Sequence, residues 1–166
     1  IALLDVTIIS IGFVLRLFVG SLATATPISM WIIIMTFLIA LFLALAKRRD
    51  DVLLLHQSGD KMRKSIDGYN LQLVDGTMMI MGSTVIVIYI LYATSQEIIE
   101  KFQSENLYLT ALFVIFGIMR YLQITLVEKQ SGSPTEIVLK DKITIINIFL
   151  WILSLVWIIY LAPTNL

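Results

Sequence analysis

The chain has 166 residues, of which 58% are apolar and only 14% are charged, and its mean hydropathy is +0.92. A soluble domain carries about a quarter charged residues, so this composition excludes an ordinary globular domain and favours an integral membrane protein. The net charge is zero, which gives no global field for attracting nucleic acid, and the sequence has no cysteine and one histidine, which excludes disulfides, thiolate metal sites and His-cluster metal sites.

Five apolar segments are each close to the roughly 20 residues that a transmembrane helix needs. In chain order they are residues 6–23, 29–46, 77–93, 107–127 and 143–161. Because a helix satisfies its own backbone hydrogen bonds in lipid, the predicted fold is an all-α polytopic transmembrane helix bundle. We expect residues 1–166 to form the C-terminal part of a single membrane domain, with a short cytoplasmic cap at 47–74. The apolar pattern is already under way by Ile8, which predicts a piece of a longer protein.

The distribution of Lys and Arg predicts the orientation. The segment between the second and third spans holds six of them and the segment between the fourth and fifth holds three, whereas the connection between the third and fourth holds one. Positive residues concentrate on the cytoplasmic side of a membrane. We therefore expect the two richer segments to face the cytoplasm, as charged loops of a protein in the bacterial inner membrane.

Arg16 lies inside the first span, with Gly12 and Gly20 four residues to either side. At about 100° per residue, these three residues share one helical face with Asp5. Glycines allow a neighbouring helix to approach closely. Arg16 therefore either pairs with a carboxylate on that neighbour or lines a cavity and faces an anion.

Arg120 and Tyr121 lie in the fourth span, about two turns before its predicted cytoplasmic end. An arginine at this depth can extend its side chain to the interface, which is the simplest explanation for it. The alternative is that Arg120 and Tyr121 contribute to a polar site inside the bundle.

The run Lys47-Arg48-Arg49-Asp50-Asp51 ends the second span. Its i,i+3 and i,i+4 pairs of opposite charge stabilise a helix end by about 0.3 kcal/mol each, so a charged stop at the membrane surface would explain it. The apolar residues 52–55 follow directly, which predicts that the helix extends into the cap. Cations bind phosphate and carboxylates bind Mg²⁺, so the same run suits a phosphorylated, metal-bound substrate.

Four segments occur in order: DVTIISIGFVLRLFVGSLAT from Asp5, LALAKRRDD at the end of the second span, IMRYLQIT in the fourth span, and SGSPTEIVLKDK before the fifth. Together they resemble the decaprenyl-phosphate phosphoribosyltransferase family, within the UbiA-type membrane prenyltransferase superfamily. The resemblance covers essentially the whole chain with matching spacing. It implies that the five spans correspond to helices 5–9 of the nine-helix UbiA-type fold.

The resemblance also implies an enzyme, a Mg²⁺-dependent transferase. It would move a 5-phosphoribosyl group from phosphoribosyl diphosphate to a polyprenyl phosphate, in cell-wall precursor or polysaccharide synthesis. Family members hold the metal–diphosphate with two acidic motifs, and the charged run matches the second, so we expect Asp50 and Asp51 to bind Mg²⁺. The side chains expected to contact substrate phosphates are Arg16, Lys47, Arg48, Tyr69, Arg120 and Tyr121.

The Asn-Asp-x-x-Asp-x-x-x-Asp motif of the family's first half is absent from these 166 residues. We therefore expect the chain to be inactive alone and to need an N-terminal half, in the same polypeptide or as a separate partner. One alternative is a UbiA-type prenyltransferase with an aromatic acceptor, although the charged run lacks the Asp-x-x-x-Asp spacing usual there. The other is a non-enzymatic membrane bundle or transporter fragment, for which we find no internal repeat.

Overall fold

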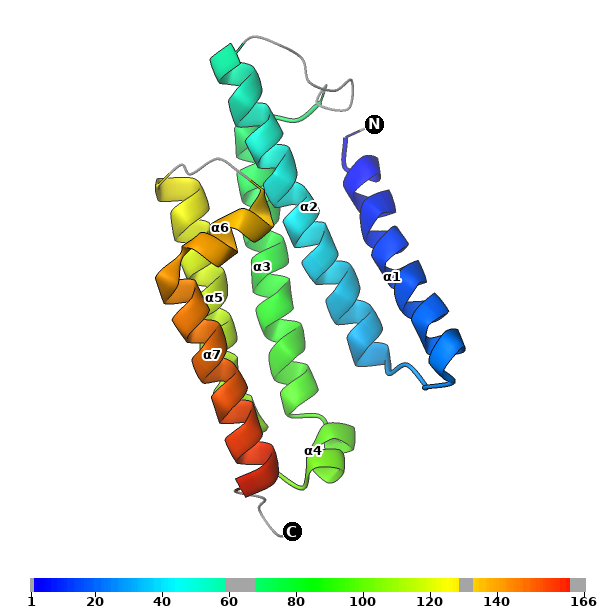
Figure 1. Cartoon of the computed structure of the whole chain (residues 1–166). Coiled ribbons are helices and arrows are strands. Elements are labelled where there is room, and N and C mark those ends of the chain that lie inside the picture. The colour runs from blue at the N-terminus through cyan, green and yellow to red at the C-terminus, as the bar shows by residue number, and fades with distance from the viewer. Residues whose placement is uncertain (1, 59–67, 129–132, 162–166) are drawn as a thin grey trace. The chain divides into compact units, whose positions relative to one another are not determined.

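The computed structural model describes residues 2–58, 68–128 and 133–161 (Figure 1). Every regular element within these ranges is a helix, which confirms the all-α prediction. Five helical stretches of the described chain are long and apolar enough to cross a membrane: Leu4–Thr24, Met30–Leu55, Leu71–Ala93, Asn106–Val127 and Lys142–Leu161. These stretches match the five predicted spans in number and order. The chain forms two compact units, one of residues 1–85 and 131–134 and one of residues 86–130 and 135–166.

In the first unit, α1 (Leu4–Thr24) and α2 (Met30–Ser58) run antiparallel and pack against each other (Figure 1). Val6 and Ser10 are the buried residues of α1, and Ser10 turns its hydroxyl back to the carbonyl of Val6. The 29 residues of α2 extend for about 44 Å, which exceeds the roughly 30 Å thickness of a bilayer core. The helix therefore continues through and beyond the charged run, as the sequence predicts.

The third long helix, α3 (Leu71–Ala93), begins six residues before the predicted start of its span. The side chain of Asn70 accepts a hydrogen bond from the backbone N–H of Leu73 at 2.7 Å, and this cap starts the helix at that point. The predicted cap at 47–74 is thus helical at both of its ends. Its middle part, residues 59–67, lies outside the described residues.

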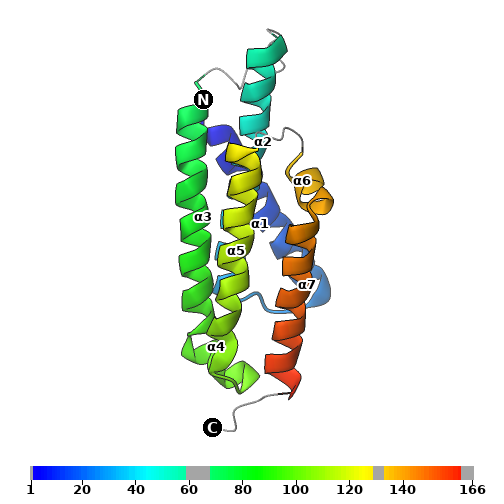
Figure 2. The ribbon, with the colours of Figure 1, turned by 90° about the vertical axis from the view of Figure 1, so that its left-hand side faces the viewer.

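The second unit contains the end of α3 followed by shorter elements. They are α4 (Gln96–Phe102), the 3₁₀ turn η2 (Asn106–Thr110), α5 (Ala111–Leu122), the π-helical turn η3 (Gln123–Val127), α6 (Pro134–Lys140), α7 (Lys142–Val156) and the π-helical turn η4 (Trp157–Leu161). α5 and α7 lie side by side (Figure 2). The buried residues Ala93, Ile98 and Leu107 form a small core where α3, α4 and η2 meet.

A polar contact joins three elements of this second unit. The hydroxyls of Tyr89 and Thr110 lie 2.8 Å apart, and the indole N–H of Trp151 donates to the Tyr89 oxygen at 3.1 Å. Each polar tip of these amphipathic side chains therefore has a partner inside an otherwise apolar bundle, as burial requires.

Candidate functional site

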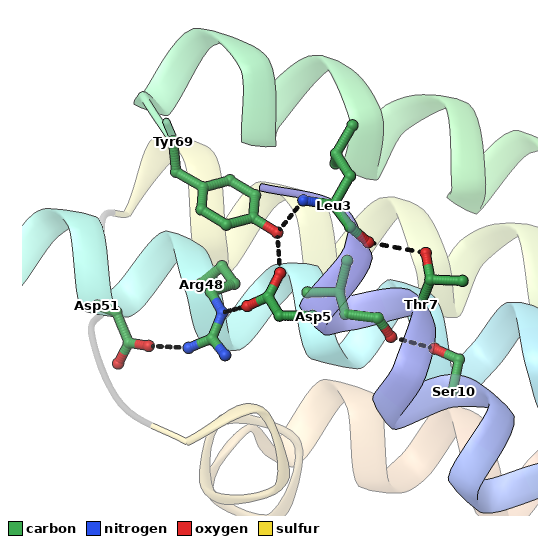
Figure 3. Close-up of polar contacts among 8 residues, drawn as sticks. Leu3, Asp5, Thr7, Ser10, Arg48, Asp51 and Tyr69 are labelled. Carbon is green, nitrogen blue, oxygen red and sulfur yellow. Dashed lines mark hydrogen bonds and ion pairs between the residues drawn. The ribbon is translucent and has the colours of Figure 1, made fainter. Parts of the chain in front are cut away.

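Arg48 is at the centre of the polar contacts in the first unit. Its Nε donates to Oδ2 of Asp5 at 2.6 Å, and its Nη1 donates to Oδ2 of Asp51 at 2.7 Å (Figure 3). The Arg48 side chain is 5% exposed, so a buried guanidinium lies between two carboxylates that come from different helices. The Arg48–Asp51 contact confirms the predicted i,i+3 pair, whereas the contact with Asp5 joins α2 to the first turn of α1.

Tyr69 completes this group from the segment just before α3. Its hydroxyl donates to Oδ1 of Asp5 at 2.6 Å and accepts from the backbone N–H of Leu3 at 2.7 Å (Figure 3). Burial disfavours the phenolate, and the hydrogen bond to Asp5 adds to this effect, which together raise the pKa of Tyr69 to about 12. Tyr69 is therefore a hydrogen-bond donor at neutral pH.

We refer to Asp5, Arg48, Asp51 and Tyr69 as the Arg48 cluster. Two carboxylates and one guanidinium give it a formal charge of about −1, since Tyr69 is neutral. Arginine has five N–H donors, and the two bonds to carboxylates use two of them. The same guanidinium can therefore also donate to a phosphate oxygen without losing both carboxylate partners.

The neighbours of Arg48 along α2 point in other directions. Arg49 is buried and its Nε pairs with Oδ1 of Asp75 on α3 at 2.6 Å. Lys47 is exposed, and Asp50 is half-buried. Successive residues of a helix are about 100° apart, so Asp50 and Asp51 diverge around α2.

These positions limit the kind of metal site the charged run can form. Among the described residues, no three His, Asp or Glu side chains gather into a group that could hold a metal ion. Mg²⁺ commonly uses only one or two protein carboxylates, together with waters and substrate phosphates. One of these carboxylates, Asp50 or Asp51, therefore fits an ion bridged to a substrate phosphate, and the run does not fit an ion that the protein holds alone.

In the second unit, Arg120 forms a separate network. Its Nε and Nη2 donate to the two carboxylate oxygens of Asp141 at 3.1 and 2.8 Å, and its Nη1 donates to Glu128 at 2.9 Å. Asp141 also caps α7, because its Oδ2 accepts from the backbone N–H and the hydroxyl of Thr144. These hydrogen bonds, that from Arg120 first, hold the pKa of Asp141 well below its usual range although burial opposes them. Tyr121, next to Arg120, is buried.

Arg16 is exposed on α1, with its guanidinium carbon 5.0 Å from the ring centroid of Phe13. Because α1 is continuous, Arg16 lies about 16 Å along the helix axis from Asp5. Of the six predicted phosphate contacts, the structure thus brings Arg48 and Tyr69 together, while Lys47 is next to them along α2. Arg16 is far along α1, and Arg120 and Tyr121 belong to the second unit.

Four acidic partners were not among the predicted site residues: Asp5, Asp75, Glu128 and Asp141. A signal for the first two exists in the sequence. Both lie near the end of an apolar segment, and antiparallel neighbours bring such ends to the same membrane face as the arginines that end the second span. Where a sequence places arginines at the end of a span, acids at the ends of neighbouring spans are therefore the candidates for their partners.

No protein-family model matches the chain. The chain is similar to proteins named decaprenyl-phosphate phosphoribosyltransferase in three species. It is 29% identical over 157 residues to that of Mycolicibacterium smegmatis, which covers 91% of this chain and 49% of the relative. It is 24% identical over 160 residues to that of Corynebacterium glutamicum, which covers 96% of this chain and 48% of the relative. It is 23% identical over 157 residues to that of Mycobacterium tuberculosis, which covers 95% of this chain and 49% of the relative. The chain thus spans about half the length of these curated relatives, and the similarity confirms the resemblance that the four segments predict.

Proposed function

We propose that this chain is one half of a membrane transferase that moves a 5-phosphoribosyl group from phosphoribosyl diphosphate to a polyprenyl phosphate. The observation that carries the proposal is the similarity, over 91–96% of the chain, to decaprenyl-phosphate phosphoribosyltransferases. Five long apolar helices suit an acceptor whose prenyl tail partitions into the bilayer.

The Arg48 cluster is the best candidate for the phosphate-binding part of the site. It lies where α1 begins and where the charged run interrupts the apolar part of α2, so phosphates from water and from a lipid can both reach this level. The distribution of Lys and Arg predicts that this face is cytoplasmic. A water-soluble phosphoribosyl donor would approach from that side.

The proposed reaction needs positive charge where the diphosphate leaves. As the bond between the anomeric carbon and the diphosphate oxygen breaks, negative charge grows on the diphosphate and the ribose gains oxocarbenium character. Fixed cations aimed at that oxygen stabilise the transition state, and among the described residues Arg48 and Lys47 are cations at this face that can do so. Asp5 keeps the Arg48 guanidinium oriented while its other N–H groups bind phosphate.

The acceptor phosphate is already anionic at neutral pH, so it needs positioning more than a strong base. Tyr69, whose pKa is about 12, stays protonated and can donate its hydroxyl to a phosphate oxygen in place of Asp5. Asp50 and Asp51 are the residues proposed to hold Mg²⁺ against the diphosphate. The bound ion would neutralise part of the leaving-group charge.

The test uses the complete open reading frame that contains this chain, expressed in membranes with labelled phosphoribosyl diphosphate, decaprenyl phosphate and Mg²⁺. We expect labelled lipid from the complete protein and none from the 166 residues alone, because the first acidic motif is absent from them. A second assay supplies a prenyl diphosphate and 4-hydroxybenzoate. Membranes that leave decaprenyl phosphate unmodified but transfer the prenyl group to 4-hydroxybenzoate, with release of diphosphate, would instead identify a prenyltransferase with an aromatic acceptor.

The proposed metal role is tested in the same complete protein with Asp51→Asn. We expect the turnover at saturating substrate to fall at least tenfold and the Mg²⁺ concentration for half-maximal rate to rise. Asp75→Asn is the matched control, since Asp75 pairs with the neighbouring Arg49 and lies outside the Arg48 cluster. An Asp51→Asn enzyme with unchanged Mg²⁺ dependence would remove Asp51 from the metal site.

A further inference from the structure

The exposed side of α1 around Arg16 has a feature that the proposed site does not use. Arg16 is exposed, and among the described residues its side chain contacts the ring of Phe13 and pairs with no carboxylate. A Cβ atom added at Gly12 or at Gly20 would meet nothing within 4 Å. The face defined by Gly12, Arg16 and Gly20, here called the Arg16 face, is therefore open in this chain.

The depth of Arg16 makes this face unusual for lipid contact. α1 has 21 residues, and Arg16 lies about 18 Å along the axis from Leu4 and about 12 Å from Thr24. Its guanidinium stacks on Phe13, three residues earlier, so the side chain points away from the nearer end of the helix and towards the middle of the span. It does not extend to the interface, and a charge at this depth requires a polar partner.

The sequence rules out this chain as the source of that partner. None of its twelve Asp and Glu residues lies in the middle of an apolar span. The acids inside or next to the membrane-spanning stretches all lie near an end of a stretch, and five of them already pair with arginines: Asp5, Asp51, Asp75, Glu128 and Asp141. A second copy of the chain therefore cannot place a carboxylate opposite Arg16.

We propose that the Arg16 face docks a transmembrane helix from outside these 166 residues, and that this helix carries an Asp or Glu near its midpoint. Gly12 and Gly20 let the two backbones approach closely on either side of Arg16, as small residues at four-residue spacing do in membrane helix pairs. The carboxylate supplies the negative charge that Arg16 needs as a partner. The inference does not depend on the proposed transferase activity.

A headgroup phosphate is the competing partner, and depth argues against it. An anion bound at the interface is separated from Arg16 by two to three helical turns, whereas a helix side chain can be placed at any depth. Gly12 and Gly20 also favour binding of a helix over binding of a lipid. Small residues at this spacing let two helix backbones pack closely, whereas a flexible lipid chain does not need a surface without side chains.

The docking is tested with a defined probe in phosphatidylcholine vesicles. The probe is a synthetic polyleucine helix with a central Asp flanked by alanines four residues away, and the control probe has Leu in place of Asp. Energy transfer between labelled chain and labelled peptide reports association. We expect the Asp probe to associate at least tenfold more tightly with the unmodified chain than with Arg16→Ala, and the Leu probe to show no such preference.

Two further variants separate docking from misfolding. Gly20→Leu keeps Arg16 and adds bulk in open space, so the chain should fold normally and still lose the Asp probe. Leu15→Ala shortens an exposed neighbour of Arg16 on another side of α1 and should leave association unchanged. Equal binding of the Asp probe to the unmodified, Arg16→Ala and Gly20→Leu chains would overturn the proposal, as would Arg16-dependent binding of undecaprenyl phosphate without Arg16-dependent binding of the peptide.

Discussion

At the scale of residues, three arginines of the described chain bind carboxylates on other elements: Arg48, Arg49 and Arg120. Arg48 binds carboxylates on α1 and α2, Arg49 binds Asp75 on α3, and Arg120 binds Asp141 and Glu128. Removing one partner of a buried ion pair leaves a charge without compensation, which costs more than the pair contributes when it is intact. The acids at the helix ends are therefore as important to this fold as the arginines.

The substitution Asp5→Asn tests this arrangement. It removes the charge that faces Arg48 but leaves the pair with Asp51, so we expect the free energy of unfolding to fall by about 1–3 kcal/mol. Unfolding by denaturant in mild detergent, followed by circular dichroism, measures this change. Glu136→Gln is the control, because Glu136 pairs with Lys140 on the exposed surface of α6 and should change stability little. Equal losses in both variants would contradict a special role for Asp5.

Tyr69 gives a prediction about high pH. The pKa of its hydroxyl is about 12 in the folded chain and about 10 when unfolded, so its contribution to stability is complete below pH 10 and is lost as the pH rises through 12. In the absorbance of phenolate at 295 nm, the difference between the chain and its Tyr69→Phe variant should appear near pH 12. The same difference for the denatured chains should appear near pH 10. A folded-state transition near pH 10 would show that Tyr69 is not held by Asp5.

At the scale of elements, two glycines differ in what surrounds them. A Cβ atom on Gly117 of α5 would lie 3.1 Å from the side-chain nitrogen of Asn147 on α7, which donates to the carbonyl of Phe113 at 2.9 Å. A Cβ atom on Gly76 of α3 would meet nothing within 4 Å. α5 and α7 therefore approach closely because Gly117 has no side chain, whereas Gly76 has no such packing role within the described residues.

Matched substitutions at these positions test the close approach. Gly117→Leu should reduce the free energy of unfolding by about 1–3 kcal/mol, because the added atoms displace Asn147 and separate α5 from α7. Gly76→Leu should have no such cost and can stabilise α3 by up to about 1 kcal/mol through its better helix propensity. Denaturant titrations of both variants in the same detergent give the comparison. A larger loss at Gly76 would contradict the packing described for the second unit.

At the scale of the whole molecule, the absence of cysteine makes the predicted orientation easy to test. Glu100 of α4 and Lys140 of α6 are both exposed, and they lie on connections that the distribution of Lys and Arg assigns to opposite sides. In intact cells, a membrane-impermeant maleimide should label Glu100→Cys at once and Lys140→Cys only after permeabilisation. The reverse pattern would invert the orientation and move the Arg48 cluster away from the cytoplasm.

Much of the fold was predictable from local sequence, but the candidate site was predictable only in part. The five spans follow from run length and composition, and the Arg48–Asp51 pair follows from helical spacing. The helix α3 begins at Leu71, before the predicted span, because Arg49 pairs with Asp75, the charged residue that interrupts the apolar pattern there. The sequence gives Arg16 and Arg48 the same predicted role of phosphate binding. In the structure Arg48 binds Asp5 at the start of α1, and Arg16 lies about 16 Å further along that helix.

The sequence alone determined that this is a membrane bundle, roughly where its five spans lie and which family it resembles. Each of these depends on residues that are close together in the chain or on their order. The tertiary structure decided which charges meet. Asp5 and Arg48 are 43 residues apart, and Arg120 and Asp141 are 21 apart, so their pairing depends on which helix ends come together. The same packing left Arg16 without a carboxylate among the described residues. Lipid cannot solvate these charges, so each arginine requires a partner, and only the packing of helices determines whether this chain provides it.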